Sequence, residues 1–238
     1  MSDAKKTIGI LGGMGPLATA DLFEKIVLLT EAETDRDHIR VYIDSNANIP
    51  DRTAAILNNG EDPVPEMSSA LRNLEKCGAD CIIMPCNTAH YFLPRPQEMT
   101  SIPFLSILTA AAEACKARFP GKNVGILGTT GTLTANLSQT ALAEAGVAYQ
   151  VPNSQEQEAL MRVIYQGVKA GKGPDSYRAD FLTVLEGMHA QGAEVFLLGC
   201  TELPMAAEAL HITLPTVDPT AELAKAAIRF CGYGVRGE

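Results

Sequence analysis

The sequence has no long apolar run and no surplus of basic residues. Crossing a bilayer takes about 20 consecutive apolar residues, and the apolar stretch near the N-terminus, Ile8–Leu11, is too short even for a secretory signal. Lys and Arg total 19 against 28 Asp and Glu, a formal net charge of −9, which argues against a broad cationic surface for nucleic acid. We therefore expect a cytoplasmic protein whose partners include no nucleic acid and no membrane. A local Arg or Lys would still permit a small acidic ligand.

Spacings typical of metal and nucleotide sites are also missing. Of the six cysteines, only Cys77 and Cys81 are close in sequence, and no second pair accompanies them as a structural zinc site would require. The glycine-rich stretch Gly9–Gly15 is not G-x-G-x-x-G, and no G-x-x-x-x-G-K-[ST] occurs. We expect free thiols, no metal and no cofactor. The glycine stretch itself has two interpretations, a tight strand-to-helix turn or a backbone site for an anion at a helix N-terminus.

Short β-rich runs alternate with amphipathic helical stretches along the chain. A helix is expected from Pro16 to about Thr30, and a second helical stretch should end at Gly78. Strands separated by helices indicate an α/β fold with mainly parallel sheets flanked by helices, and 238 residues allow one large or two small domains. The expected strands are Ile8–Leu11, Ile39–Ile43, Cys81–Met84, Ile102–Ile107, Asn123–Leu127, Val147–Val151 and Val195–Leu198.

Two segments of the sequence occur twice. IGILGGMGPL at Ile8–Leu17 matches VGILGTTGTL at Val124–Leu133, an offset of 116. A Gly-Ala-acid sequence also leads into a strand that ends at Cys86 and again into one that ends at Cys200, an offset of 114. Two matches with nearly equal offsets predict two similar halves related by internal pseudo-symmetry. Because ligands of open α/β sheets bind beyond the carboxyl ends of strands, facing halves would bring both thiols to one active site between them.

Paired thiols suggest a particular chemistry. Inverting a stereocentre by proton transfer needs a base on one face of the carbon and an acid on the other, and cysteine can serve as either. A nucleophilic cysteine hydrolase would instead need one cysteine with a positioned histidine. His90 follows Cys86 by four residues, but nothing equivalent follows Cys200, so we interpret His90 as a structural or supporting residue. A non-catalytic protein that binds an acidic ligand or a nucleotide through the glycine turns stays open as an alternative.

The sequence resembles the cofactor-independent aspartate/glutamate racemase superfamily, and the aspartate racemases most closely. The similar stretches are IGILGGMGPLATADLF, NIPDRTAAIL, CIIMPCNTAH, VGILGTTGTL, VIYQGVKAG and LLGCTELP, in the family's order from residue 8 to residue 204. Relatives that share this fold but catalyse other reactions differ in cysteine usage or in the flanking motifs. The resemblance therefore implies an isomerase, a racemase that interconverts L- and D-aspartate by a two-base proton transfer at the α-carbon. Glutamate or a broader range of amino acids is the alternative.

The resemblance also implies roles for individual residues. Cys86 and Cys200 match the two catalytic acid/base thiols, and Arg52 and Lys169 match basic residues that hold the substrate's carboxylates. An Arg suits this task because its planar fork binds a carboxylate through two hydrogen bonds. The other positions implied to contact substrate are Met14, Asn87, Thr88, Thr129, Thr130 and Thr201, with Asp51 and Glu202 as possible supports for the thiols.

The resemblance finally implies the organisation of the chain. Residues 1–103 with 209–238 should form the first racemase-like domain, and residues 104–208 the second. A C-terminal helix around Ala221–Phe230 should return to cover the first domain. A homodimer is expected, with a small acidic amino acid as substrate and no cofactor.

Overall fold

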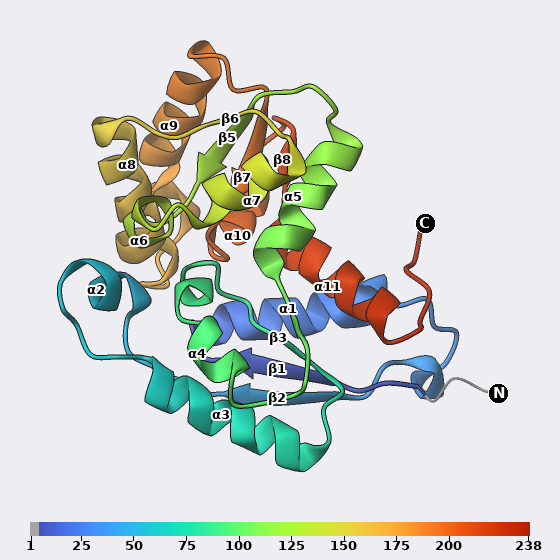
Figure 1. Ribbon diagram of the computed structural model, residues 1–238. Coiled ribbons are helices and arrows are strands. Elements are labelled where there is room, and N and C mark those ends of the chain that lie inside the picture. Colours follow the sequence, from blue (N-terminus) through green and yellow to red (C-terminus); the bar gives the residue numbers. More distant parts are fainter. Residues whose placement is uncertain (1–4) are drawn as a thin grey trace. The chain divides into compact units, whose positions relative to one another are not determined.

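The chain divides into two compact units, each of which is described here by itself. The computed structural model describes residues 5–238 (Figure 1). The first unit comprises the residues up to Ala110 together with Thr220–Glu238, and the second comprises Ala111–Pro219. Two helices cross these boundaries, α5 (Ile107–Arg118) and α11 (Pro219–Phe230).

The first unit is built on a four-stranded parallel sheet of order β2-β1-β3-β4. Its strands are β1 (Ile8–Gly12), β2 (Val41–Ser45), β3 (Cys81–Ile83) and β4 (Phe104–Leu105). Its helices are α1 (Pro16–Leu29), α2 (Arg52–Leu57), α3 (Val64–Cys77) and α4 (Pro94–Gln97), with single 3₁₀ turns η1 (Asp35–Asp37) and η2 (Thr88–Tyr91). Gly78 ends α3 in the left-handed conformation, at φ 83°, as its place in the sequence predicts.

The second unit repeats this arrangement with a parallel sheet of order β6-β5-β7-β8. Its strands are β5 (Val124–Leu127), β6 (Tyr149–Gln150), β7 (Val195–Leu198) and β8 (Thr216–Val217). Its helices are α6 (Thr130–Thr134), α7 (Leu137–Ala145), α8 (Ser154–Met161), the π-helix η3 (Arg162–Val168), the 3₁₀ turn η4 (Pro174–Ser176), α9 (Arg178–Ala190) and α10 (Leu203–Ala209). The equal strand order confirms the predicted fold class of two similar parallel sheets.

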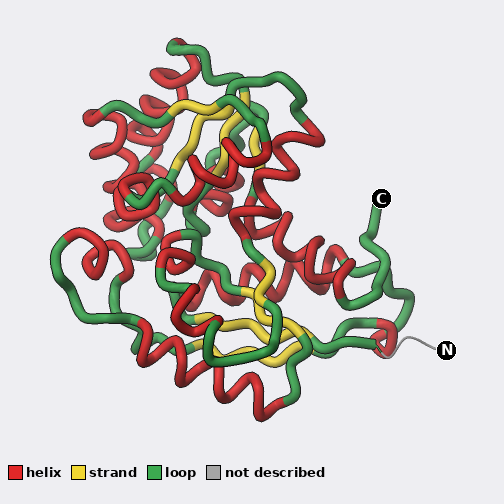
Figure 2. The backbone as a smooth tube through the Cα atoms, viewed as in Figure 1, coloured by secondary structure: helices red, strands yellow, loops and turns green. Residues whose placement is uncertain are grey.

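Helices lie on both faces of each sheet (Figure 2). Because successive residues of a strand point to opposite faces, each sheet packs against helices on both sides. In β1, Ile8 and Ile10 pack with α1 and α11, whereas Leu11 packs on the other face with α3. In β7, Val195 and Leu197 pack with α5, whereas Phe196 packs on the other face with α8 and α9. Each unit therefore has two hydrophobic layers, one on either side of its sheet.

The short edge strands place the unit boundaries further along the chain than residues 103 and 208. Ile83 of β3 pairs with Leu105 of β4, so the chain still belongs to the first sheet there. Leu197 of β7 likewise pairs with Val217 of β8, which keeps that segment in the second unit. Strand β8 has only two residues, and the sequence analysis did not predict it. The second strand also begins later than expected, at Val41.

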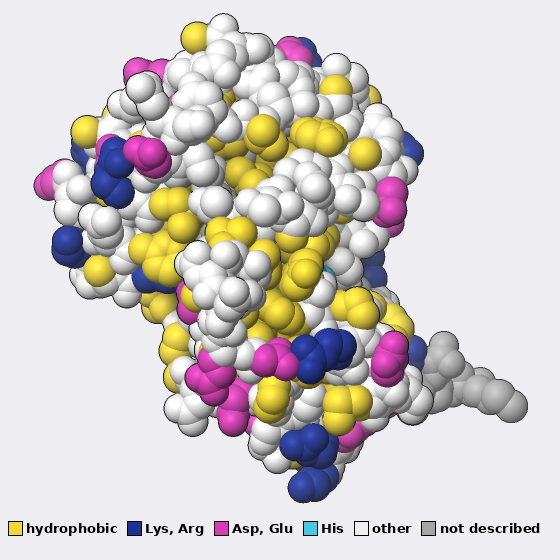
Figure 3. Space-filling view, turned by 60° about the vertical axis from the view of Figure 1, so that its left-hand side comes forward, with side chains coloured by type: hydrophobic (Ala, Val, Ile, Leu, Met, Phe, Trp, Pro, Cys, Tyr) yellow, Lys and Arg dark blue, Asp and Glu magenta, His cyan; other side chains and the backbone are white. Residues whose placement is uncertain are grey.

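Two further properties concern the surface and the helices. On the face seen in Figure 3, Lys and Arg side chains lie in small separate groups beside acidic ones, without a broad basic patch among the residues drawn in colour. From residue 5 to residue 238, no helix combines the length and the apolar character that a membrane crossing demands.

Candidate active site

Cys86 lies at the carboxyl end of the first sheet, three residues after β3. Its thiol side chain is buried, with 7% of the residue exposed. A tight turn directs the chain here, because the Cys86 N–H donates to the Met84 carbonyl at 2.9 Å. The short turn η2 begins two residues later at Thr88.

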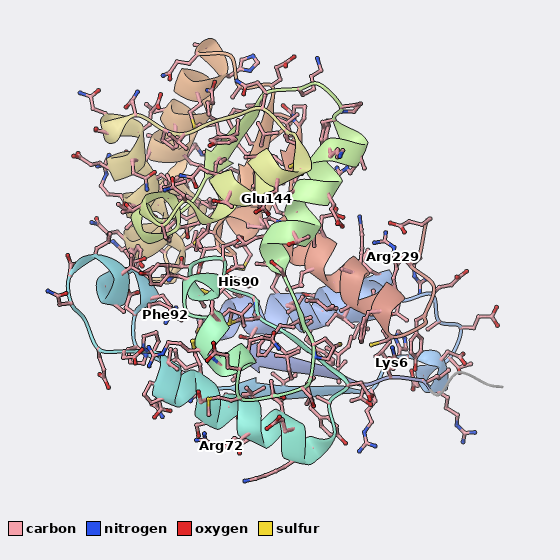
Figure 4. All side chains as sticks on the ribbon, viewed as in Figure 1. Lys6, Arg72, His90, Phe92, Glu144 and Arg229 are labelled. Carbon is pink, nitrogen blue, oxygen red and sulfur yellow. The ribbon has the colours of Figure 1, made fainter. Side chains whose placement is uncertain are left out.

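His90 supports the backbone of this turn rather than the thiol. Its Nδ1 lies 2.9 Å from the carbonyl oxygen of Cys86 and must be the donor, because a carbonyl only accepts. Burial lowers the pKa of His90 to about 4, so its ring is neutral near pH 7 (Figure 4 labels the side chain). The hydrogen bond accounts for His90 as a structural residue, in line with the interpretation from the sequence.

Asn87 brings an unsatisfied donor next to Cys86. The residue is 3% exposed, and its Nδ2 has no hydrogen-bond partner within residues 5–238. Buried polar groups are nearly always paired, so such an atom is a candidate for contact with a ligand. The neighbouring Thr88 is buried as well.

Arg52 is buried and anchors two segments of the first unit. Its Nη1 donates to the carbonyls of Ile49 and Pro50 at 3.1 and 2.9 Å, and its Nη2 donates to the carbonyl of Met14 at 3.1 Å. With 8% of the residue exposed, it is not a surface charge. The carboxylate of Asp51 caps helix α2 by accepting from the Ala54 N–H at 2.8 Å, which gives this residue a local structural role.

Packing accounts for the glycines of the turn after β1. Gly13 has φ 91°, and a Cβ atom there would collide with the backbone of Asn46. A Cβ atom at Gly12 would collide with the side chain of Thr19, whose Oγ1 accepts from the Gly13 N–H at 2.9 Å. These contacts favour the tight strand-to-helix turn over the anion site, because the Gly13 N–H is already used.

Cys200 occupies the equivalent position in the second unit, two residues after β7. Its Sγ donates to Oε2 of Glu202 at 2.9 Å, and the residue is 7% exposed. Burial, and then the negative charge of Glu202, raise the pKa of the Cys200 thiol well above its ordinary value. Near pH 7 the group is therefore a thiol and not a thiolate. Thr201 Oγ1 lies 3.4 Å from the same carboxylate oxygen.

Lys169 completes a charged group around Cys200. Its Nζ lies 3.7 Å from Oε1 of Glu202 and 4.6 Å from the centre of the Tyr165 ring. The π-helix η3 carries Tyr165 and ends immediately before Lys169, so this irregular turn determines where the ammonium group lies. The positive charge of Lys169 acts on the pKa of Cys200 in the opposite direction to Glu202 and lowers it.

The threonines after β5 lie at the same edge of the second sheet. Thr129 caps α6, since its side chain accepts from the Thr132 N–H at 3.2 Å. Thr130 contacts α8: its N–H lies 3.4 Å from Sδ of Met161, and its Oγ1 accepts from Nε2 of Gln157 at 3.2 Å. Sequence reasoning missed Gln157, for which no motif exists, and did not single out Tyr165, although this residue lies inside the VIYQGVKAG stretch.

Each unit thus gathers part of the predicted set. Arg52 and Met14 meet near the turn after β1, while Lys169, Glu202 and Cys200 meet beyond β7. Within the described part of the chain, no three His, Cys, Asp or Glu side chains gather in the way metal ligands do. A thiol donor beside a carboxylate, with a lysine next to both, is an arrangement suited to moving a proton.

The chain is similar to several known proteins over nearly its whole length. It is 27% identical over 227 residues to a broad specificity amino-acid racemase of Bacillus subtilis, covering 93% of this chain and 96% of the relative. An aspartate racemase of Picrophilus torridus has the same fold with a TM-score of 0.84 and 32% identity, over 97% of this chain and 96% of that one. An aspartate racemase homologue from Pyrococcus horikoshii matches with a TM-score of 0.75 and 26% identity, over 96% and 99% of the two chains.

A family model agrees with these similarities. The model for Asp/Glu/hydantoin racemases matches residues 11–227, a range that includes both candidate cysteines. The resemblance seen in the sequence motifs is confirmed. Because the match spans both units, this chain belongs to the Asp/Glu/hydantoin racemase family.

Proposed function

We propose that this protein interconverts L- and D-aspartate by proton transfer at the α-carbon, with Cys86 and Cys200 as the acid/base pair. The proposal is carried by two buried thiols at equivalent places, one following β3 and the other following β7. No pyridoxal phosphate is needed in this scheme, because both the acid and the base are side chains of the protein.

In the proposed cycle Cys200 starts as the acid, a role that its hydrogen bond to Glu202 supports. Cys200 delivers its proton to the α-carbon, and Cys86 acts as the base that removes the α proton from the opposite face. One turnover leaves Cys86 protonated and Cys200 deprotonated, and the reverse reaction from the other enantiomer restores the first state. Reacting atoms lie about 3–3.5 Å apart in productive complexes, so the closed complex requires sulfurs roughly 7 Å apart.

Glu202 and Lys169 support this cycle in opposite ways. The carboxylate of Glu202 holds Cys200 as the acid, and it repels the thiolate that forms once the proton has left. The ammonium of Lys169 lies close enough to Glu202 to offset part of that repulsion. Lys169 therefore lowers part of the free-energy cost of forming the Cys200 thiolate, a state that a two-base cycle passes through.

Aspartate is proposed as the substrate for two reasons. An aspartate racemase of Picrophilus torridus is 32% identical across nearly the full chain, and Arg52 and Lys169 offer one cation in each unit for the two carboxylates of this substrate. Both cations already have partners, Arg52 three backbone carbonyls and Lys169 the carboxylate of Glu202. Substrate carboxylates would thus share or replace these contacts. Met14, Asn87, Thr88, Thr129, Thr130 and Thr201 are proposed as further contacts.

A broader substrate range is the second candidate. It is favoured by the relative from Bacillus subtilis, a broad specificity amino-acid racemase that matches 93% of this chain. One methylene group typically changes discrimination by only about 1–3 kcal/mol, so aspartate and glutamate are hard to separate by pocket size alone. The homodimer expected from the sequence also stays a prediction, which light scattering on the purified protein would check.

The test is to incubate the reduced protein with L-aspartate in deuterated water without added cofactor. We expect D-aspartate by chiral chromatography and deuterium at the α-carbon by NMR. Cys86→Ala and Cys200→Ala should each stop racemisation, yet each should retain α-proton exchange of one enantiomer, with opposite preferences. Cys77→Ala, which removes an exposed thiol, is the matched control and should behave as the unaltered protein.

Two results would contradict the proposal. A single-alanine variant that still racemises would refute the two-thiol assignment. Absence of both racemisation and exchange with every amino acid tried would favour the non-catalytic alternative, a protein that binds a small ligand without turning it over.

A further inference from the structure

Two cysteines that the proposed function does not use meet inside the first unit. Cys81 is the first residue of β3, and Cys231 directly follows α11, 150 positions later in the sequence. Cys81 is fully buried and Cys231 is 3% exposed. Their thiols share a hydrogen bond. Because the sulfur atoms of such a bond already lie in contact, only a short approach separates this pair from a disulfide.

The tertiary fold, and not a local motif, brings these thiols together. Successive residues of β3 point to opposite faces of the sheet, so Cys81 and Ile83 share the face that α1 and α11 cover. Leu223, Ala227 and Cys231 follow one another at the four-residue spacing of a single helix face, and all three are buried in the same hydrophobic layer. The N–H of Cys231 still donates to the Ala227 carbonyl at 3.0 Å, so the helical geometry continues up to the thiol.

The surroundings make Cys231 the more reactive of the two thiols. The hydrogen bond that Cys81 donates lowers the pKa of Cys231 below its ordinary value, although burial and the charge of Asp80 act against it. The ammonium of Lys6 adds to the lowering. It lies 4.1 Å from the centre of the ring of Phe230, the residue before Cys231 (Figure 4 labels Lys6). Since the thiolate is the nucleophile, Cys231 is the thiol that reacts first.

The segment after Cys231 offers a small oxidant a route to this thiol. Gly232, the next residue, is exposed. Residues 232–238 are held to the end of α1 by backbone hydrogen bonds, one of them from the Arg236 N–H to the Leu29 carbonyl at 2.7 Å. Short segments held in this way open locally more readily than packed helices do. Such an opening would uncover the thiol while α11 stays packed on the sheet.

We propose that Cys81 and Cys231 form a reversible disulfide when hydrogen peroxide oxidises the protein, and that this bond ties α11 to β3. The thiolate of Cys231 attacks one peroxide oxygen, which forms a sulfenic acid and releases hydroxide. The sulfur of Cys81 then attacks the sulfenic sulfur, so that the S–S bond forms, the S–O bond breaks and the oxygen leaves as water with the Cys81 proton. In total the two thiols lose two electrons and two protons, and one peroxide becomes two molecules of water.

The bond would strengthen the connection by which the chain returns to the first unit. Helix α11 begins at the unit boundary and holds to the first sheet through its buried apolar face. A cross-link between residues 150 positions apart restricts the unfolded chain and thereby stabilises the folded one. The proposal does not depend on the racemase function, because neither thiol belongs to the proposed acid/base pair.

The first experiment maps the bond in the unaltered protein. The reduced full-length protein is treated with hydrogen peroxide, unfolded, alkylated with iodoacetamide and digested for mass spectrometry. We expect the peptides that contain Cys81 and Cys231 to be joined, lighter by two hydrogen atoms, and to separate again with dithiothreitol. Loss of alkylation at Cys77, an exposed thiol, shows in the same sample that the dose of peroxide was sufficient.

The second experiment measures the effect of the bond on stability. All proteins carry Cys77→Ala, which prevents disulfides between molecules through the exposed thiol. Peroxide should raise the Tm by at least about 5 °C, and dithiothreitol should reverse the shift. Cys231→Ala should abolish the shift, whereas Cys115→Ala, which removes a buried thiol from a different hydrophobic layer, should retain it. Circular dichroism of the reduced variants checks that each is folded.

Three results would overturn the proposal. In the first, Cys81 and Cys231 are both alkylated at a dose that oxidises Cys77. In the second, either thiol is linked to another cysteine, or Cys231 is oxidised to the sulfinic acid without a link. In the third, the oxidised and reduced proteins have the same Tm. Neither experiment measures racemase turnover, so each of these results leaves the proposed function intact.

Discussion

The thiol of Cys200 donates a hydrogen bond to the carboxylate of Glu202 across 2.9 Å. They are two positions apart in the sequence, so the turn after β7 brings the acid/base candidate and its acceptor together locally. Lys169 reaches the other oxygen of the same carboxylate from a distant part of the chain, at 3.7 Å. The protonation of Cys200 therefore depends on both a local turn and the tertiary fold of the second unit.

Glu202→Gln should lower the pKa of Cys200, because the amide still accepts the hydrogen bond but no longer carries a negative charge. Alkylation of Cys200 by iodoacetamide, followed by mass spectrometry, should therefore begin at lower pH in the variant. Racemase turnover should fall by about tenfold or more, the scale of a perturbed acid/base group. Glu208→Gln, on the exposed side of α10, is the control. An unchanged alkylation profile in the Glu202 variant would show that its charge does not act on the thiol.

Arg52→Lys should destabilise the first unit and reduce turnover of aspartate by at least about tenfold. Lysine keeps the charge but cannot reach the carbonyls of Met14, Ile49 and Pro50 together, and unmade hydrogen bonds to buried groups cost about 1–3 kcal/mol. Urea unfolding and kcat/KM measure the two effects. Arg72→Lys, an exposed position on α3, should change neither. If the Arg52 variant had the same unfolding free energy and the same kcat/KM as the unaltered protein, the anchoring role of Arg52 would be wrong.

Gly13→Ala should destabilise the protein far more than Gly121→Ala. Both glycines have positive φ, 91° and 76°, so an alanine at either position is strained by about 1 kcal/mol because its backbone must adopt the left-handed conformation. Only at Gly13 does the new Cβ meet the backbone of Asn46, whereas at Gly121 it meets open space. We expect a total cost at Gly13 above about 3 kcal/mol, measured by urea unfolding. Equal effects at the two positions would mean that the turn can shift to admit a side chain.

Acid should destabilise the protein through His90. Its pKa is about 4 in the folded state and 6.5 in the unfolded reference, so the unfolded state binds the extra proton. Its contribution to stability is complete above pH 6.5 and is lost as the pH falls towards 4, by about 3 kcal/mol in total. His90→Asn should remove this part of the pH dependence, measured by urea unfolding at pH 7 and pH 4.5. His211→Asn, at an exposed site, is the control and should show the same pH dependence of the unfolding free energy as the unaltered protein. If His90→Asn also lost the same stability between pH 7 and pH 4.5 as the unaltered protein, His90 would not be the group responsible.

Sequence patterns predicted the regular elements best where a strand or helix is long enough to show periodicity. Strand β7 coincides with the predicted Val195–Leu198, and α1 begins at the expected Pro16. Strand β8 escaped prediction because two residues, Thr216 and Val217, carry no recognisable alternation. Their pairing with β7 makes them a strand, and that pairing also moved the unit boundary beyond residue 208.

The sequence by itself determined that the chain has two similar halves and that one cysteine follows a central strand in each, because a repeated segment carries its strand, turn and thiol with it. Only the tertiary structure decided what surrounds those groups. The packing of α8 lets the amide of Gln157 donate to the Gly128 carbonyl in the turn after β5. Lys169 pairs with Glu202, which lies 33 positions further along the sequence. No local pattern encodes such contacts, since burial and partner geometry arise only when the helices pack on their sheet.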